Sequence, residues 1–277
     1  MSAVAEHLDQ EFTHGGHRLV FDEIGEGTEV VVYLHGLLLD SEINRGIARA
    51  LAEGGRRVLL LDLLGHGRSD QPRHASEYRI DRYAHQVVGL LDHLGVDEAV
   101  LGGVSLGANV SLFAATEHPE RVRGLILEMP VLEWAVPAAA LTFAPLLLAA
   151  HYGRRVMELS AGLVSHLPRT PFGPLNSVIR SGAMAPEVMA AVLHGILVGP
   201  VAPTVEQRRA IEAPALILAH RNDLIHPFSD AENLARQLPA ARLVRSMSSL
   251  ELRLLPTRLT REVATFVDGC WPAAAVA

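Results

Sequence analysis

Short apolar runs rich in β-branched residues alternate with segments of helical periodicity along most of this chain, and this alternation limits the fold more than any other feature. The predicted strands are residues 16–24, 29–34, 57–61, 98–104, 122–127, 214–219 and 241–246. The predicted helices are residues 41–53, 80–94, 105–118, 229–238 and 260–267. Most of these strands are apolar on both faces, which is typical of a parallel sheet covered by helices on both sides. The sequence therefore predicts an α/β protein with a doubly wound, mainly parallel sheet.

The alternation stops between residues 130 and 210, where Ala, Leu, Met and Pro dominate and only helix-like pieces are found. It resumes at residue 214, so the sheet is interrupted by an inserted helical segment. The chain has 277 residues, of which 49% are hydrophobic, and this suits one large core. We expect a single domain over residues 1–277, with a core of residues 1–130 and 211–277 and a helical cap over about 131–210.

Charge and cysteine content exclude several classes of protein. The formal net charge is −7, with 24 basic side chains scattered among 31 acidic ones, which argues against a nucleic-acid-binding surface. A small neutral or apolar ligand fits this balance better. The single cysteine, Cys270, excludes an internal disulfide.

Two segments bear on targeting. Residues 1–10 are acidic and polar, unlike the basic and then apolar pattern of a signal peptide. The longest apolar stretch, residues 134–150, contains Pro137 and Pro145 and is too short for a membrane span. We therefore expect a cytoplasmic protein that does not associate with membranes. The sequence leaves the oligomeric state open, with a homodimer as one option.

The segment Gly103-Val104-Ser105-Leu106-Gly107 lies between a predicted strand and a predicted helix. A serine hydroxyl is a weak nucleophile unless it is held exposed beside a base, and a sharp strand-to-helix turn holds it in that way. Glycines two residues on either side relieve the crowding of such a turn. A tight turn that merely contains serine would give the same pentapeptide, but the flanking strand and helix favour a catalytic Ser105, with the Leu106 amide at the helix N-terminus able to stabilise an oxyanion.

The chain resembles the α/β-hydrolase superfamily, in the branch with a helical cap. The resembling pieces occur in the order of the family: His35-Gly36, the stretch from Asp62 to Asp70, the Ser105 segment, and Asp223 after a late strand. The resemblance implies the α/β-hydrolase fold and a second oxyanion amide at Leu37. It also implies that Asp223 is the acid of a catalytic triad, although an aspartate in a turn is a plain alternative. Glu128, at the end of the preceding strand, is a second candidate acid.

The chain departs from the family pattern at the histidine. The family places its base in the loop after the last strand, near Ser249 or Glu251 here, but residues 247–253 contain no histidine and none follows His226. Three explanations stay open. His226, three residues beyond Asp223, has taken the role of base, with His194 as a more remote candidate; or Ser105 acts with water, Glu251 or the substrate; or the site has lost hydrolysis.

The inserted segment gives the only indication of substrate. Residues 134–150 carry bulky apolar side chains with almost no charge, as a lid over an apolar acyl or alkyl group would, but helices packed on a core show the same pattern. The predicted pocket residues are His35, Trp134, Phe143 and His194.

The best-supported function is hydrolysis of an ester, thioester or related acyl bond in a small, largely apolar substrate. The predicted site consists of Ser105, Asp223 and His226, with oxyanion donors at Leu37 and Leu106. No metal site and no cofactor is expected, since the histidines and glycines match no metal, P-loop or dinucleotide motif. The alternatives are a ligand-binding protein without hydrolytic activity, or a lyase or cyclase on the same fold.

Overall fold

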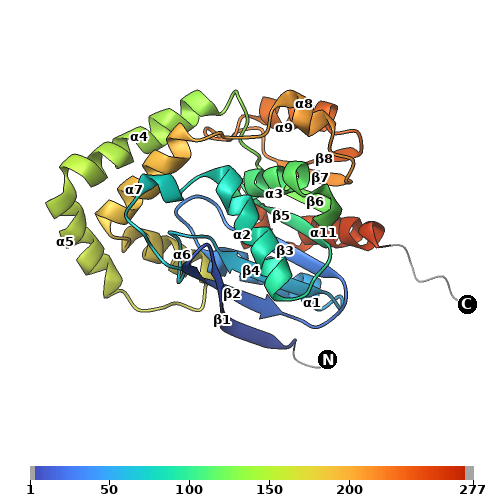
Figure 1. The fold of residues 1–277 in the computed structure, drawn as a ribbon, viewed down its shortest axis with the longest axis horizontal. Coiled ribbons are helices and arrows are strands. Elements are labelled where there is room, and N and C mark those ends of the chain that lie inside the picture. The colour runs from blue at the N-terminus through green and yellow to red at the C-terminus, as the bar shows by residue number, and fades with distance from the viewer. Residues whose placement is uncertain (1–3, 272–277) are drawn as a thin grey trace, which may run out of the picture.

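An eight-stranded sheet forms the centre of the computed structural model, which describes residues 4–271 (Figure 1). Residues 1–3 and 272–277, at the two ends of the predicted core, lie outside this range. The strand order is β1-β2-β4-β3-β5-β6-β7-β8. The strands are β1 (Glu6–His14), β2 (His17–Ile24), β3 (Val30–Leu34), β4 (Arg57–Asp62), β5 (Ala99–Val104), β6 (Val122–Glu128), β7 (Ala215–Ala219) and β8 (Ala241–Arg245).

The sheet is mainly parallel, which confirms the predicted fold class. The pairs β1·β2 and β2·β4 are antiparallel, and the five remaining pairs, from β4·β3 to β7·β8, are parallel. The seven predicted strands correspond to β2–β8. The strand β1 was not predicted, because this edge strand pairs on one side only and Phe12 is its one buried side chain.

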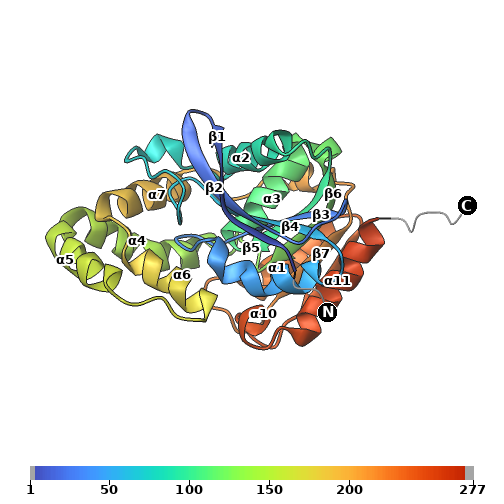
Figure 2. The ribbon, with the colours of Figure 1, turned by 90° about the horizontal axis from the view of Figure 1, so that it is seen from below.

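Helices cover both faces of the sheet, as Figure 2 shows. The helices α1 (Arg45–Ala52) and α11 (Thr257–Cys270) pack on one face, and α2 (Ile80–His93), α3 (Leu106–Glu117) and α9 (Phe228–Gln237) pack on the other. Alternate residues of β3 divide between the two cores: Val32 packs with α2 and α3, whereas Tyr33 packs with α1 and α11. Both strand faces are buried, which is why these strands are apolar throughout.

The short helical elements complete the fold. They are the 3₁₀ turns η1 (Ser41–Asn44), η2 (Ala75–Glu77) and η3 (Pro119–Arg121), and the helix α10 (Glu251–Leu254). The predicted helix over 41–53 is therefore η1 followed by α1, and α10 lies in a segment for which no helix was predicted.

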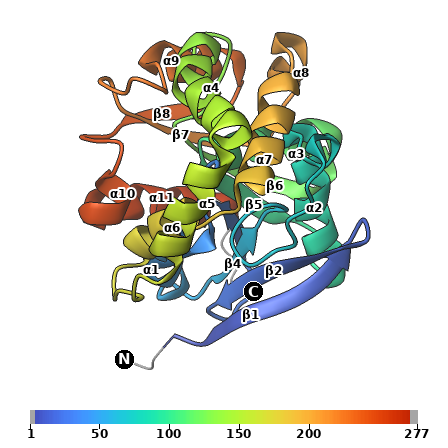
Figure 3. The same ribbon diagram turned by 90° about the vertical axis from the view of Figure 1, so that its left-hand side faces the viewer.

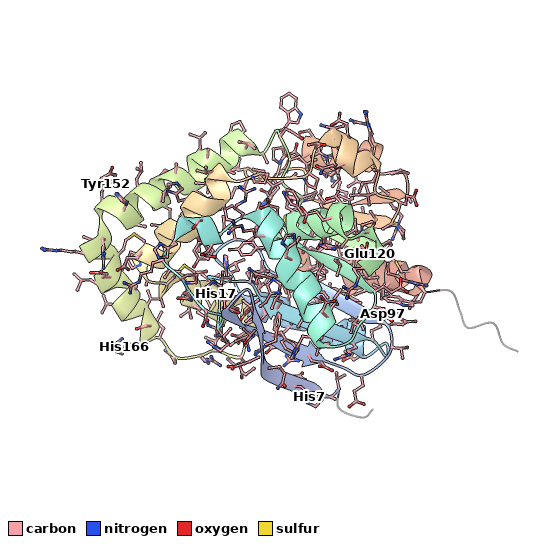
Figure 4. The ribbon with its side chains drawn as sticks, viewed as in Figure 1. His7, His17, Asp97, Glu120, Tyr152 and His166 are labelled. Carbon is pink, nitrogen blue, oxygen red and sulfur yellow. The ribbon has the colours of Figure 1, made fainter. Side chains whose placement is uncertain are left out.

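A helical insertion connects β6 to β7. It contains α4 (Val136–Tyr152), α5 (Arg154–Ser165), α6 (Gly173–Gly182), α7 (Pro186–Val198) and α8 (Val205–Arg209). The helices α4 and α7 lie side by side, and α4 to α7 lie to one side of the sheet (Figures 1 and 3). Tyr152 and His166 lie at the outer edge of the insertion (Figure 4). Within residues 4–271 no single helix is both long and apolar enough to span a membrane; the pairs α4–α5 and α6–α7 reach that length and composition only when each bent pair is taken together.

The topology decides where a site can form. The strands β3, β5, β6 and β7 run parallel, so the segments that follow Leu34, Val104, Glu128 and Ala219 all emerge at one edge of the sheet. Ligands of open α/β sheets bind at this carboxyl edge. The loop after β3, the Ser105 turn and the Asp223 loop are therefore brought together by the fold.

Candidate active site

Ser105 lies in a strained turn between β5 and α3. Its φ and ψ angles are 54° and −107°, a backbone conformation that residues other than glycine rarely adopt. The turn is held on both sides, since the Ser105 amide donates to the Glu128 carbonyl at 2.8 Å and the Asn109 amide donates to the Ser105 carbonyl at 3.1 Å. Strain of this kind persists only where the surrounding structure over-determines it, and it is common at functional sites.

The two glycines of the turn are required by close packing on β3. A Cβ atom on Gly103 would lie 2.5 Å from the Leu34 carbonyl oxygen, and a Cβ atom on Gly107 would lie 2.7 Å from the Leu34 Cβ. Real Cβ atoms do not approach other heavy atoms this closely. The pattern of glycines around Ser105 is therefore a packing requirement of the sharp turn.

Asp223 and His226 lie on the loop between β7 and α9. One carboxylate oxygen of Asp223 accepts the backbone amides of Ile225 and His226, both at 2.9 Å, which curls the loop into a tight turn. The same oxygen lies 3.0 Å from His226 Nδ1, and His226 Nε2 lies 2.9 Å from Ser105 Oγ. The side chains of His226 and Asp223 are only 14% and 11% exposed. The three predicted residues thus form one hydrogen-bonded chain.

The charge of Asp223 determines which atoms donate and which accept in this series of hydrogen bonds. Burial raises the pKa of the Asp223 carboxyl, but the hydrogen bond and charge of His226, with the amides of His226 and Ile225, outweigh it and hold the pKa at about 2. Asp223 is therefore ionised at neutral pH and can only accept hydrogen bonds. Nδ1 of His226 must then carry the proton, which leaves Nε2 free to accept the proton of the Ser105 hydroxyl.

The predicted oxyanion donors lie on either side of Ser105. Leu37 and Leu106 both line a cavity that also contains Ser105. Within residues 4–271 neither of their backbone amides donates a hydrogen bond. The loop that carries Leu37 is shaped by a turn in which the Leu39 amide donates to the Gly36 carbonyl at 3.1 Å, and by Leu38 with a φ of 62°. Two free amides beside a nucleophile are the requirement for stabilising an oxyanion.

The other candidate acid, Glu128, is engaged elsewhere. It is buried at the end of β6, accepts a hydrogen bond from the Tyr33 hydroxyl at 3.0 Å, and forms an ion pair with Arg253. Arg253 also donates to the Asn44 side chain at 2.8 Å. The Glu128 carboxylate is thus committed to a structural network rather than to His226.

The loop in which the family carries its base is occupied by a second structural carboxylate. Glu251 is 1% exposed, accepts hydrogen bonds from Arg258 at 2.9 Å, and also accepts the Met247 amide. It does not line either cavity at Ser105. Ser249, at the other predicted position, does line a cavity with Ser105 and His226.

Two cavities meet at Ser105. The first has a volume of about 160 Å³ and is enclosed by α4, α7 and the start of α3, and the second, of about 300 Å³, lies on the side of His226. Phe143 of α4 lines both of them, as the predicted pocket requires. The lining of the first cavity is largely aliphatic: Leu37, Ile80, Leu106, Val131, Val136, Ala139, Ala140, Ile196, Leu197, Val201 and Ile225.

Three predicted pocket residues lie outside both cavities. Trp134 is 68% exposed on the surface. His35 is completely buried, where it donates to the Gly36 carbonyl at 2.8 Å and accepts the Leu63 amide at 3.0 Å, and burial lowers its pKa. His194 lines a separate hollow with His151 and Arg154. The sequence around a single aromatic or histidine residue does not show toward which side of its helix or loop the side chain will point. The positions of these three side chains therefore differ from the prediction.

Asn109 was not predicted from the sequence, although it lies only four residues beyond Ser105. Its side-chain amide donates to the carbonyls of Val131 and Val201, both at 2.6 Å, and its side-chain oxygen accepts the Val131 amide at 3.0 Å. Val131 precedes the insertion helices α4–α7 and Val201 follows them. Asn109 therefore ties both ends of this helical segment to the helix that begins at the nucleophile.

One group of side chains has the composition of a metal site. His85, Glu117 and His118 place one donor atom each within 4.8 Å of one another on the surface of α2 and α3. His85 Nε2 lies 3.0 Å from the Glu117 carboxylate, so these two side chains form a hydrogen-bonded pair with each other. The group shares no residue with the cavities at Ser105.

Comparisons with known proteins agree with the fold. A family model described as the alpha/beta hydrolase fold matches residues 29–156. An AB hydrolase superfamily protein of Bacillus subtilis is 28% identical over 242 residues, which cover 82% of this chain and 85% of that protein. The crystal structure of an enol-lactonase from Burkholderia xenovorans LB400 superposes with a TM-score of 0.75 at 22% identity, covering 93% of this chain and 99% of that one.

A shorter match involves an enzyme of different printed activity. A haloalkane dehalogenase of Mycolicibacterium paratuberculosis is 35% identical over 97 residues, which are 35% of this chain and 32% of that protein. The matched part thus spans only about a third of the length of this relative. Together with the sheet order and the position of the strained serine, the comparisons show that the chain has the α/β-hydrolase fold and that its sequence is similar to proteins of the α/β-hydrolase superfamily.

Proposed function

We propose that this chain is a serine hydrolase that cleaves ester, thioester or related acyl bonds in small, largely apolar substrates. The observation that carries the proposal is the hydrogen-bonded chain from Ser105 Oγ through His226 to the Asp223 carboxylate, with distances of 2.9 and 3.0 Å. Nucleophile, base and orienting acid in this geometry are the recurring arrangement of serine hydrolases.

In the proposed reaction Ser105 Oγ attacks the acyl carbon while its proton passes to Nε2 of His226. The Asp223 carboxylate stabilises the imidazolium that forms, and the amides of Leu37 and Leu106 donate to the oxyanion. His226 then returns the proton to the leaving atom, and a water molecule, activated by the same imidazole, hydrolyses the acyl-enzyme. This assigns the role of the family's base to His226, which lies on the loop of the acid.

The cavity supports an apolar substrate. Its walls consist of aliphatic side chains and Phe143, and one residue with a side-chain amide, Asn109, also lines it. In this proposal α4 and α7 act as a cap, because Val136, Ala139 and Phe143 of α4 and Ile196 and Leu197 of α7 close the space above Ser105. An apolar acyl chain would replace water there, with a gain of about 25 cal/mol for each Å² of apolar surface buried.

The proposal is tested with a fluorophosphonate probe, which labels a serine only when that serine is activated. We expect the native protein to be labelled and to hydrolyse short-chain acyl esters, and Ser105→Ala to do neither while unfolding at the same temperature. A folded native protein that resists labelling would favour the ligand-binding alternative. Labelling without acyl-ester turnover would favour a lyase or cyclase on the same fold.

A further inference from the structure

The second cavity at Ser105 is lined in part by the loop after β8. In the family that the chain resembles, this loop supplies the base, and here its place is taken by Ser249, Leu250 and Arg253, which line about 300 Å³ of space beside Ser105 and His226. Asp223, whose carboxylate is engaged by His226, and Gly36 also line this cavity, and the rest of the lining is apolar: Leu37, Leu39, Ile43, Val104, Met129, Phe143 and Ile225. The position at which the family carries its base therefore borders open space in this chain.

Arg253 does not make this cavity an anion site. Its guanidinium is 5% exposed and is paired with the Glu128 carboxylate, which is equally buried. The pair is neutral as a whole, and the Asn44 side chain accepts a further hydrogen bond from Arg253. A buried charge that is already paired offers little to a second anion, so the cavity fits an uncharged group.

The position of His226 distinguishes the two cavities chemically. His226 lines the second cavity and not the first, whereas Leu106, a predicted oxyanion donor, lines the first and not the second. Acid catalysis requires the protonated imidazole to reach the leaving atom, and oxyanion stabilisation requires the acyl oxygen to reach the two amides. The acyl part and the leaving part of a substrate must therefore lie on opposite sides of Ser105.

We propose that the second cavity binds the leaving group, an uncharged apolar alcohol or thiol of several carbons, while the first cavity binds the acyl chain. This assignment rests on the proposed function. In the acylation step the bond from Ser105 Oγ to the acyl carbon forms and the bond from that carbon to the leaving oxygen or sulfur breaks. The serine proton moves through His226 to the leaving atom, which departs as a neutral alcohol or thiol into the second cavity.

The test uses two series of esters and two matched variants of the full chain. In one series a butanoyl group is joined to methyl, butyl or hexyl alcohol; in the other, methyl esters carry acyl chains of four to eight carbons. Leu250→Trp fills the second cavity and Ala139→Phe fills the first. We expect Leu250→Trp to lower kcat/KM for hexyl butanoate at least about tenfold more than for methyl butanoate, and Ala139→Phe to do the same for methyl octanoate relative to methyl butanoate.

The controls separate the possible failures. If both variants lower both series equally, or if Leu250→Trp discriminates by acyl length, the assignment of the cavities is overturned while the hydrolase proposal stands. If the native protein hydrolyses no ester, the proposed function fails, and this assignment with it. Should Leu250→Trp lower the unfolding temperature strongly, Ser249→Phe fills the same cavity from the neighbouring residue, and its discrimination between hexyl and methyl butanoate decides the question.

Discussion

The turn at Ser105 and the loop from Asp223 to His226 meet at a distance of 2.9 Å, yet they are held in place by different forces. The serine turn is fixed by packing: it lies between a buried strand and a buried helix, with both glycines against Leu34. The Asp223 loop is fixed by hydrogen bonds, since one carboxylate oxygen accepts two backbone amides and the imidazole.

This contrast shows how a single fold can keep one part of a site constant and relocate another. The position of a packed turn is determined by the whole sheet, so Ser105 cannot move without moving β5 and α3. The Asp223 loop is organised by one carboxylate and does not form part of the sheet. In the proposed mechanism the base therefore belongs to the part of the site that is free to change.

The largest expected effect is on catalysis and concerns the loop. His226→Ala should lower kcat/KM for an acyl ester by about 10⁴-fold or more, because the Ser105 hydroxyl loses its proton acceptor. Leu224→Ala is the matched control: Leu224 lies on the same loop but is 91% exposed, so activity should be unchanged. Steady-state kinetics of both variants decides the matter. Turnover within a few fold of native in His226→Ala would remove His226 from the mechanism.

A smaller effect should follow from disturbing the packed turn. Gly107→Ala places a Cβ against Leu34, where there is no space, and should lower the free energy of unfolding by about 1–3 kcal/mol. Gly162→Ala, in α5 with nothing within 4 Å of its Cβ position, should instead leave stability unchanged or raise it by up to about 1 kcal/mol. Chemical denaturation of the two variants measures the difference. Equal effects would mean that packing does not hold the serine turn.

The smallest expected effect is on the pH dependence of stability, and it again concerns the loop that carries Asp223. The pKa of Asp223 is about 2 in the folded protein, below its ordinary value of 3.8, so ionised Asp223 favours the folded state. This contribution is fully present above the unfolded value and is lost as the pH falls through the folded value. The difference in unfolding free energy between the native protein and Asp223→Asn should therefore shrink as the pH falls below about 4. A difference that does not change with pH down to 3 would contradict the loop description.

The contrast between packing and hydrogen bonding also explains what the sequence could predict. The strands β3 to β7 were predicted because burial on both faces leaves a clear apolar pattern. Ser105 was predicted because its turn needs glycines at fixed spacing between a strand and a helix. Asp223 was predicted because its place after β7 matches that of the triad acid in the family that the chain resembles.

The role of His226 could be posed from the sequence only as one of three explanations, because spacing alone does not say where a loop directs a ring. The position of the ring depends on one Asp223 oxygen that accepts the amides of residues 225 and 226, and a turn of this kind depends on side-chain geometry that no pattern records. The cavity lining was difficult for a similar reason. Trp134, His35 and His194 had plausible chemistry, but burial and helix orientation directed each of them elsewhere.

The placement of acid and base on one short loop has a consequence for how such a chain can diverge. All three groups of the proposed relay precede α9, so substitutions, insertions or recombination in β8 and the two helices that follow cannot remove a proton-transferring residue. In the proposed assignment, that carboxyl-terminal part contributes to the second cavity through Ser249, Leu250 and Arg253. Changes there would alter which leaving group is accepted while the proposed relay stays intact.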